Sequence, residues 1–128
     1  MMHRRHFLAL AAAGAVAATA KTALAAAASL QAIEAAIASG KPLLTHVTAP
    51  WCGTCRRQKP IVAELLAKPE FRTLTKIDVD FDSQREVLSK FRVQTQATML
   101  VFKNGKEVGR SIGETNPEAL ATFFKQAL

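Results

Sequence analysis

The chain has 128 residues, which is enough for one domain with one hydrophobic core. Its formal charge of +7 falls to +4 once residues 1–25, which contain Arg4, Arg5 and Lys21 but no acidic residue, are set aside. The remaining basic residues are scattered and not interleaved with aromatic ones, so the composition argues against a nucleic-acid-binding protein.

The first 25 residues have the three parts of an export signal. Arg4-Arg5 form a basic head, an apolar run extends from residue 7 to residue 20, and Ala23-Leu24-Ala25 gives a small-x-small cleavage pattern. The run of 14 residues is shorter than the roughly 20 that a helix needs to cross a bilayer. We therefore expect residues 1–25 to be a cleavable signal and residues 26–128 to be a domain without a stable membrane anchor.

The head of this signal also indicates the export route. Arg4-Arg5 followed by Phe7-Leu8 resembles the twin-arginine export signal, and the moderate apolarity of the run and Lys21 agree with it. The alternative is an ordinary export signal that contains two arginines. Either route predicts that the mature protein works outside the cytoplasm, in a bacterial periplasm.

The first half of the mature chain predicts a helix, a strand and a second helix. Apolar residues at helical spacing begin at Leu30 and stop before Ser39-Gly40-Lys41-Pro42. Residues 43–48 are short, apolar and β-branched, as in a buried strand. A turn containing both cysteines then leads into a helix over about residues 52–68.

The second half predicts one more parallel unit and a hairpin. A strand is expected over residues 74–79, followed by a helix that Asp82 caps. Residues 98–102 and 107–112 form strands joined at Asn104-Gly105, a typical hairpin turn, and Asn116-Pro117 begins the last helix. This order predicts an α/β fold with a mixed sheet flanked by helices on both faces.

The two cysteines are separated by two residues, in Trp51-Cys52-Gly53-Thr54-Cys55. A disulfide that closes so small a ring constrains the unfolded chain little, so stability alone is a poor reason for the pair. A zinc site needs about four ligands, and His46 is the only histidine after the signal, so we expect no metal site. An inert disulfide or a metal cluster shared by two chains is the alternative to redox exchange.

The position of the pair at a strand-to-helix junction predicts that the first cysteine is the more reactive thiol. Unsatisfied N–H groups and the dipole at a helix N-terminus favour a thiolate at Cys52, and Arg56, Arg57 and Lys59 add positive charge. Cys55, one turn later, would resolve the mixed disulfide. The basic residues are alternatively solvated charges or contacts for acidic partners.

Several spaced motifs resemble the thioredoxin family from about residue 30 to residue 128. They are the active-site turn from Ala49 to Cys55, Pro60 within the following helix, the strand Lys76-Ile77-Asp78-Val79-Asp80 and the hairpin Leu100-Val101-Phe102-Lys103-Asn104-Gly105. The resemblance implies a thioredoxin-like sheet of about four strands, because the family's usual first strand is expected to be missing.

Three positions depart from the family pattern. His46 stands where the family has a buried acid, and the resemblance suggests that it lies beneath the sulfurs and assists proton transfer; alternatively it only packs. Lys76, which partners that acid in the family, is then expected to lose its counter-charge. Ala97 replaces a cis-proline, so we expect a trans Gln96–Ala97 bond and a reshaped loop. Thr54 replaces the family's proline between the cysteines.

Together these features predict an exported thiol–disulfide oxidoreductase with Cys52, Cys55 and His46 as catalytic residues and no cofactor beyond the Cys52–Cys55 disulfide. By resemblance, residues near the sulfurs would bind substrate: Trp51, Gly53, Thr54, Gln96 and Ala97. The expected partners are disulfide-containing client proteins and a membrane electron donor. The thioredoxin-like surroundings favour a reductase; the alternatives are an oxidase or isomerase with the same pair, or a binding or chaperone module without turnover.

Overall fold

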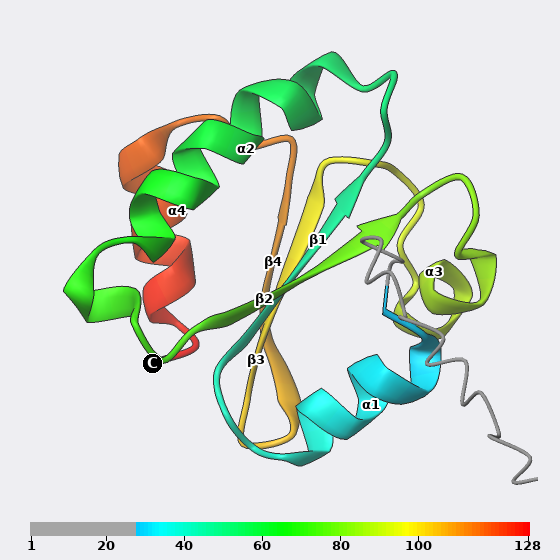
Figure 1. Ribbon diagram of the computed structural model, residues 1–128, viewed down its shortest axis with the longest axis horizontal. Coiled ribbons are helices and arrows are strands. Elements are labelled where there is room, and N and C mark those ends of the chain that lie inside the picture. The colour runs from blue at the N-terminus through cyan, green and yellow to red at the C-terminus, as the bar shows by residue number, and fades with distance from the viewer. Residues whose placement is uncertain (1–27) are drawn as a thin grey trace, which may run out of the picture.

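The computed structural model describes residues 28–128, and the predicted export signal, residues 1–25, lies outside the described residues (Figure 1). The predicted order of elements is confirmed. The elements are α1 (Leu30–Ala38), β1 (Leu43–Thr48), α2 (Gly53–Leu66), the 3-10 helix η1 (Pro69–Phe71), β2 (Thr75–Asp80), α3 (Arg85–Phe91), β3 (Thr98–Lys103), β4 (Lys106–Ile112) and α4 (Pro117–Lys125).

The four strands form one mixed sheet in the order β2-β1-β3-β4. β1 is parallel to β2 and antiparallel to β3, and β3 is antiparallel to β4. Within residues 28–128 no strand precedes β1, so the expected four-stranded α/β fold is confirmed. β1 is therefore a central strand, and the loop that leaves its carboxyl end carries the two cysteines.

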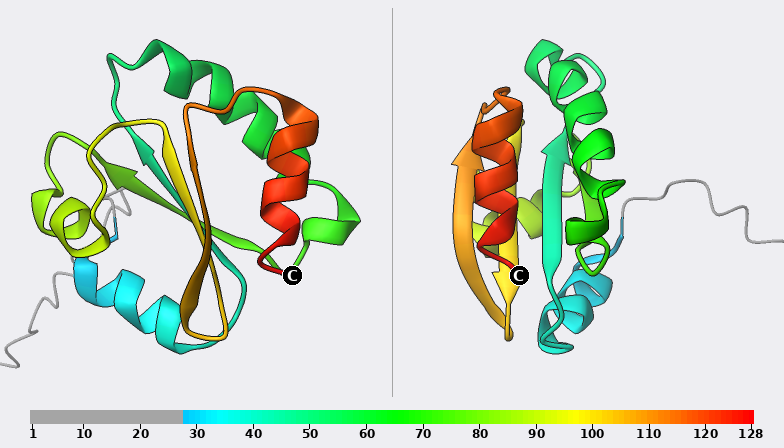
Figure 2. Two further views of the ribbon diagram at one scale, coloured as in Figure 1. Left: turned by 180° about the vertical axis from the view of Figure 1, so that it is seen from behind. Right: turned by 90° about the vertical axis from the view of Figure 1, so that its left-hand side faces the viewer.

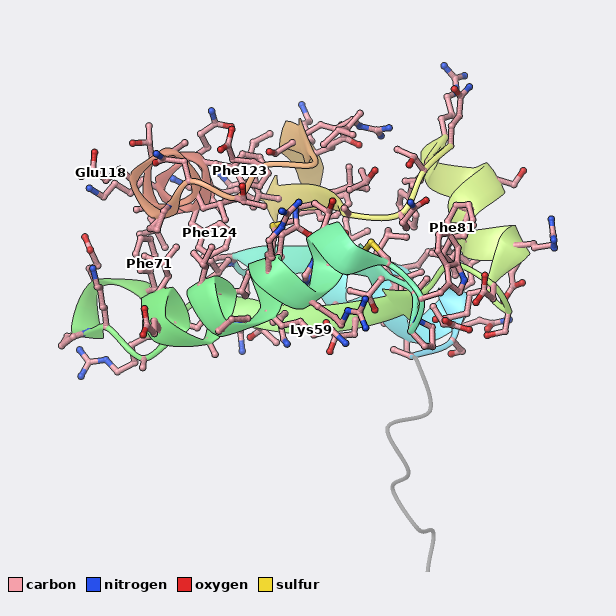
Figure 3. All side chains as sticks on the ribbon, turned by 90° about the horizontal axis from the view of Figure 1, so that it is seen from above. Lys59, Phe71, Phe81, Glu118, Phe123 and Phe124 are labelled. Atoms are coloured by element: carbon pink, nitrogen blue, oxygen red, sulfur yellow. A yellow bond between two sulfur atoms is a disulfide. The ribbon has the colours of Figure 1, made fainter. Side chains whose placement is uncertain are left out.

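Helices cover both faces of the sheet, as Figures 1 and 2 show: α2 and α4 lie on one face, and α1 and α3 on the other. Successive side chains of a strand point to opposite faces, so Leu44 packs in the core under α2 and α4, while Leu43 and Val47 pack under α1 and α3. Phe71 of η1 and Phe124 of α4 meet edge to face with ring centroids 5.8 Å apart (Figure 3).

Two predicted signals at element ends are confirmed. Asn104 and Gly105 both have positive φ angles (54° and 81°), as a tight hairpin turn between β3 and β4 requires. Asn116 caps α4, because its side chain accepts a hydrogen bond of 2.9 Å from the backbone N–H of Ala119.

The predicted cap at Asp82 is wrong. α3 begins at Arg85, its N-cap is Gln84, and no side chain makes the capping hydrogen bond. Asp82 instead accepts a hydrogen bond from the indole of Trp51, so tertiary contact with the cysteine loop overrides the local capping preference.

Candidate active site

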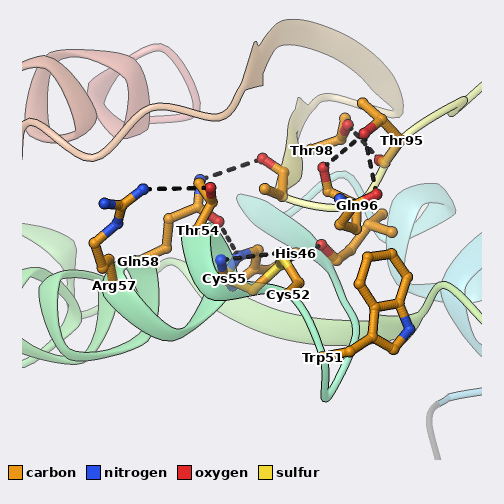
Figure 4. The surroundings of a disulfide bond; sticks show 12 residues. His46, Trp51, Cys52, Thr54, Cys55, Arg57, Gln58, Thr95, Gln96 and Thr98 are labelled. Carbon is orange, nitrogen blue, oxygen red and sulfur yellow. Dashed lines mark hydrogen bonds between the residues drawn. A yellow bond between two sulfur atoms is a disulfide. The ribbon is translucent and has the colours of Figure 1, made fainter.

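The two cysteines form a disulfide at the point where the loop after β1 enters α2 (Figure 4). Cys52 is the N-cap residue of α2, and its Sγ accepts a hydrogen bond of 3.1 Å from the backbone N–H of Cys55. A helix N-terminus leaves N–H groups without intrahelical partners and carries partial positive charge. The same N–H can therefore stabilise a thiolate on Cys52 after the disulfide is reduced.

The two sulfurs differ slightly in access. Cys52 keeps 3% of its surface exposed, whereas Cys55 is fully buried. Cys52 is flanked by Trp51, whose side chain is 57% exposed, and by Gly53, the exposed first residue of α2. An approaching thiolate or disulfide therefore meets Cys52, and Cys55 can react only with a sulfur already bound there.

Trp51 is held over the side of the site that faces α3. Its Nε1 donates to the carboxylate of Asp82, with N–O distances of 3.0 and 3.2 Å, and its ring meets Phe81 edge to face at 6.2 Å. These contacts fix the indole while most of its surface stays open to solvent. It is a preorganised apolar surface beside the exposed edge of Cys52.

The loop before β3 lies against the disulfide from the other side. Ala97 packs in the same small cluster as Cys52 and Cys55, while Gln96 beside it remains partly exposed. The Gln96–Ala97 bond is trans, as predicted, and Ala97 has a φ of +64°. Its N–H donates to the Val47 carbonyl at 2.8 Å, and its carbonyl accepts from the Gly113 N–H at 3.0 Å, which holds this unfavourable conformation in place.

His46 lies on β1 on the face covered by α2 and is buried. Its Nε2 is 2.8 Å from Oε1 of Gln58. Burial lowers the pKa of His46 below 6.5; the hydrogen bond to Gln58 and the charge of Asp78 oppose this shift, and Lys76 and Lys59 add to it. The imidazole is therefore neutral near pH 7, which is the form able to accept a proton.

Gln58 was not predicted as a site residue from the sequence, although a signal was present. It lies three residues after Cys55 and four before Val62, on the buried stripe of α2, where an apolar residue is the ordinary choice. Its side chain is fully buried, and its Nε2 donates to the carbonyls of Ala97 (3.2 Å) and Glu114 (3.0 Å). A buried amide on an apolar stripe indicates hydrogen-bonded partners that periodicity alone does not name.

The expectation that Lys76 lacks a counter-charge is wrong. Its Nζ lies 3.3 Å from the Asp78 carboxylate, two residues along the same face of the edge strand β2. Arg56, Arg57 and Lys59 are exposed on α2, and Arg57 reaches the hydroxyl of the half-buried Thr54 at 3.5 Å. Of the predicted site residues, the structure gathers Ala97 and both cysteines into one cluster, with the exposed Trp51 beside Cys52. His46 is hydrogen-bonded to Gln58, which lies one helical turn after Cys55 on α2.

The donor set fits disulfide chemistry. Among residues 28–128, no three side chains of His, Cys, Asp or Glu come together as metal ligands. The site consists of a disulfide at a helix N-terminus, an exposed aromatic side chain and a buried imidazole. Such a site can exchange disulfides through Cys52.

Comparisons with known proteins agree with this geometry. The sequence model of the thioredoxin family matches residues 24–126. A thioredoxin from Mycolicibacterium smegmatis is 37% identical over 93 residues, which cover 72% of this chain and 83% of that protein. The crystal structure of Trxlp from Edwardsiella tarda is 45% identical and superimposes with a TM-score of 0.73 over 76% of this chain and 94% of that one.

A solution structure of oxidised thioredoxin from Plasmodium falciparum is 29% identical, with a TM-score of 0.68 over 78% of this chain and 94% of that one. Thioredoxins use no cofactor beyond their redox-active disulfide, and Cys52–Cys55 is that disulfide here. The chain belongs to the thioredoxin family and is a protein thiol–disulfide oxidoreductase.

Proposed function

We propose that the chain is exported through the twin-arginine route and reduces disulfides of client proteins in the periplasm. The proposal is supported by the Arg4-Arg5 sequence pattern, which is typical of an export signal, in the same chain as a domain with a redox-active disulfide. The family match begins at residue 24, two residues before the predicted mature chain starts at residue 26. In the part of the chain that the structure describes, no helix has the length and apolarity to span a membrane.

The reaction begins with the reduced pair. The Cys52 thiolate attacks one sulfur of the client disulfide, a Cys52–client bond forms, and the other client sulfur leaves as a thiolate. Cys55 then gives its proton to a base and attacks the Cys52 Sγ. The Cys52–Cys55 bond forms, and the second client thiolate leaves. One electron pair has passed from the chain to the client, which takes up two protons.

His46 is the base that we propose for Cys55. Its Nε2 is hydrogen-bonded to Gln58, which lies one helical turn after Cys55 on the buried side of α2, and the lowered pKa of His46 keeps it neutral near pH 7. Its imidazolium can afterwards return the proton to the leaving client thiolate. The exposed indole of Trp51 and the loop of Gln96 and Ala97 flank Cys52, where a client segment would bind.

Regeneration needs a donor of two electrons. Thioredoxins are reduced by thioredoxin reductase, and a protein from Mycobacterium leprae, 33% identical over 84 residues, is named as a bifunctional thioredoxin reductase/thioredoxin. An exported chain is separated from cytoplasmic reductants, so we propose a membrane dithiol donor that delivers electrons across the bilayer.

Insulin reduction tests the chemistry. The reduced full chain is expected to precipitate insulin, and Cys52→Ser, which removes the attacking sulfur, should show no turnover. Equal activity in both proteins contradicts catalysis by this pair. The equilibrium of Cys52–Cys55 with glutathione gives the direction: a potential near the reducing end of the family range of about −270 to −120 mV supports a reductase, and one near the other end supports an oxidase.

The export route is tested in cells by replacing the arginine pair. Arg4→Lys with Arg5→Lys keeps the positive charge that an ordinary export signal needs but removes the pair. We expect the protein to remain in the cytoplasmic fraction, while the unchanged chain appears in the periplasmic fraction. Export of the double variant at the original level contradicts the twin-arginine route, and retention of both proteins contradicts export altogether.

A further inference from the structure

Gln58 is the polar side chain most completely enclosed beside the site, and every hydrogen-bonding atom of its amide has a partner. Its Nε2 carries two hydrogens and lies 3.2 Å from the Ala97 carbonyl and 3.0 Å from the Glu114 carbonyl. Its Oε1 lies 2.8 Å from Nε2 of His46. One amide thus joins β1, the loop before β3 and the segment after β4.

These contacts fix the orientation of the amide. Carbonyl oxygens only accept hydrogen bonds, so the nitrogen of Gln58 must face Ala97 and Glu114. In the reversed orientation its oxygen would face two other oxygens in a buried place, with no hydrogen between them. The oxygen of Gln58 therefore faces His46, and it too can only accept.

The orientation of Gln58 determines which nitrogen of His46 carries the proton. Because Oε1 accepts, Nε2 of the neutral imidazole is the donor, and Nδ1 is left with the free lone pair. We propose that Gln58 is a positioning residue that holds His46 in this tautomer, which leaves Nδ1 as the nitrogen that can accept a proton, the Cys55 proton in the proposed reaction. The inference rests on the proposed role of His46 and deepens it.

The same amide links the base to the substrate side of the site. The Ala97 carbonyl that accepts from Gln58 belongs to the residue that packs on both cysteines. A shift of the Ala97 loop on client binding would therefore move the amide that orients His46. If Gln58 only filled space, a change at the Ala97 loop would not alter the orientation of the His46 ring.

Few other charged groups act on His46. Lys59 comes from α2, and Lys76 and Asp78 come from β2, where Asp78 is level with His46 in the parallel register and is itself paired with Lys76. On the other side, the β3 residue opposite His46 is the apolar Met99. Gln58 makes the one hydrogen bond to the His46 ring among residues 28–128, so it is the hydrogen-bond partner there that fixes the tautomer.

The tautomer can be measured by ¹⁵N NMR on the full chain with labelled histidine. His3 and His6 are also labelled, so the His46 signals are assigned by their loss in His46→Gln. Above pH 7.5 we expect neutral His46 with the proton on Nε2. A proton on Nδ1 in the unchanged protein overturns the proposal without any variant of Gln58.

Two substitutions then separate positioning from packing. Gln58→Glu keeps an oxygen for the Nε2 proton, and Gln58→Met keeps the approximate length but has no strong acceptor. We expect the glutamate variant to retain the Nε2–H tautomer and the methionine variant to lose it. In the methionine variant, the step in which Cys55 releases a bound client thiol should slow several-fold and change its pH profile, while attack by Cys52 keeps its rate.

An unchanged tautomer and an unchanged pH profile in folded Gln58→Met overturn the proposal. These outcomes are distinct from failure of the proposed function, in which the unchanged protein itself does not reduce insulin whatever tautomer its histidine adopts. Should the methionine variant not fold, the tautomers of the unchanged protein and the glutamate variant decide alone: a proton on Nδ1 in either one contradicts the assignment.

Discussion

Thr45 and His46 are adjacent in β1 and place a polar side chain on each face of the sheet. The two side chains differ in whether they have hydrogen-bond partners. His46 faces α2, where Gln58 and the Ala97 carbonyl complete a hydrogen-bonded network. Thr45 points to the opposite face, among the apolar residues under α1 and α3, and within residues 28–128 its hydroxyl has no hydrogen-bond partner. Both side chains are buried.

The difference shows that the effect of a buried polar side chain on stability depends on whether it has hydrogen-bond partners. A lone buried hydroxyl costs free energy and serves only to fill space on a strand that favours β-branched residues. A network in which each member satisfies the next stabilises one arrangement of His46, Gln58 and the loop of Gln96 and Ala97.

Removing the amide of the network should destabilise the fold most. Gln58→Met leaves the His46 donor and the Glu114 carbonyl without their partner, at about 1–3 kcal/mol for each unsatisfied buried group. We expect the free energy of unfolding to fall by about 3 kcal/mol in urea titration. A loss below about 0.5 kcal/mol would contradict a stabilising role for the network.

Ala97, the strained residue before β3, should tolerate a smaller side chain better than a larger one. Ala97 has a φ of +64°, where a β-branched residue is strongly disfavoured and glycine is at ease. Ala97→Val should therefore cost about 2–3 kcal/mol in free energy of unfolding, from backbone strain and overpacking against the cysteines. Ala97→Gly is the matched control and should change stability by about 1 kcal/mol or less. The reverse order contradicts the positive φ.

His46 should make stability depend on pH. Burial lowers its pKa below 6.5, the value of the unfolded chain, so between the two pKa values the unfolded state binds more protons. The free energy of unfolding should therefore fall as the pH is lowered below 6.5, by at most about 1.4 kcal/mol per pH unit from this group. It should be independent of this group well above pH 6.5.

His46→Gln provides the control for that measurement. Its amide can still donate to Gln58 but does not titrate in this range, so the slope below pH 6.5 should shrink relative to the unchanged chain. Identical slopes in the two proteins, measured by urea unfolding at pH 5.0 to 7.5, would assign the pH dependence to other groups.

Thr45→Val should have the smallest effect and the opposite sign. The substitution replaces an unpartnered hydroxyl with a methyl group of similar volume among Leu43, Val47 and Leu100. We expect stability to rise by about 1 kcal/mol, measured as an upward shift of the thermal midpoint. A loss of stability would show that the Thr45 hydroxyl makes a stabilising interaction and would contradict this prediction.

Much of the fold could be predicted because the signals were local. The apolar spacing of α1 and α4, the β-branched run of β1 and the Asn104-Gly105 turn each depend on neighbouring residues. The cap at Asp82 failed because the indole of Trp51, 31 residues earlier, competes for the same carboxylate. The counter-charge of Lys76 was likewise misjudged, because Asp78 looked like an ordinary strand residue.

The site residues also differ in whether their sequence signals were local. Cys52 and Cys55 could be found from their spacing and their position before a helix. The partner of His46 could not, because Gln58 lies 12 residues away and its other partners, Ala97 and Glu114, lie 39 and 56 residues beyond it. A polar residue on the buried stripe of α2 showed that partners exist but not which ones.

The rate of alkylation of each cysteine in the reduced full chain tests whether the start of α2 stabilises a Cys52 thiolate. With iodoacetamide at pH 7 and mass analysis of the peptides, Cys52 is expected to react much faster than an unperturbed thiol, because its thiolate is stabilised by the start of α2, while buried Cys55 stays protected. Equal labelling of the two cysteines at the rate of a free thiol would contradict it.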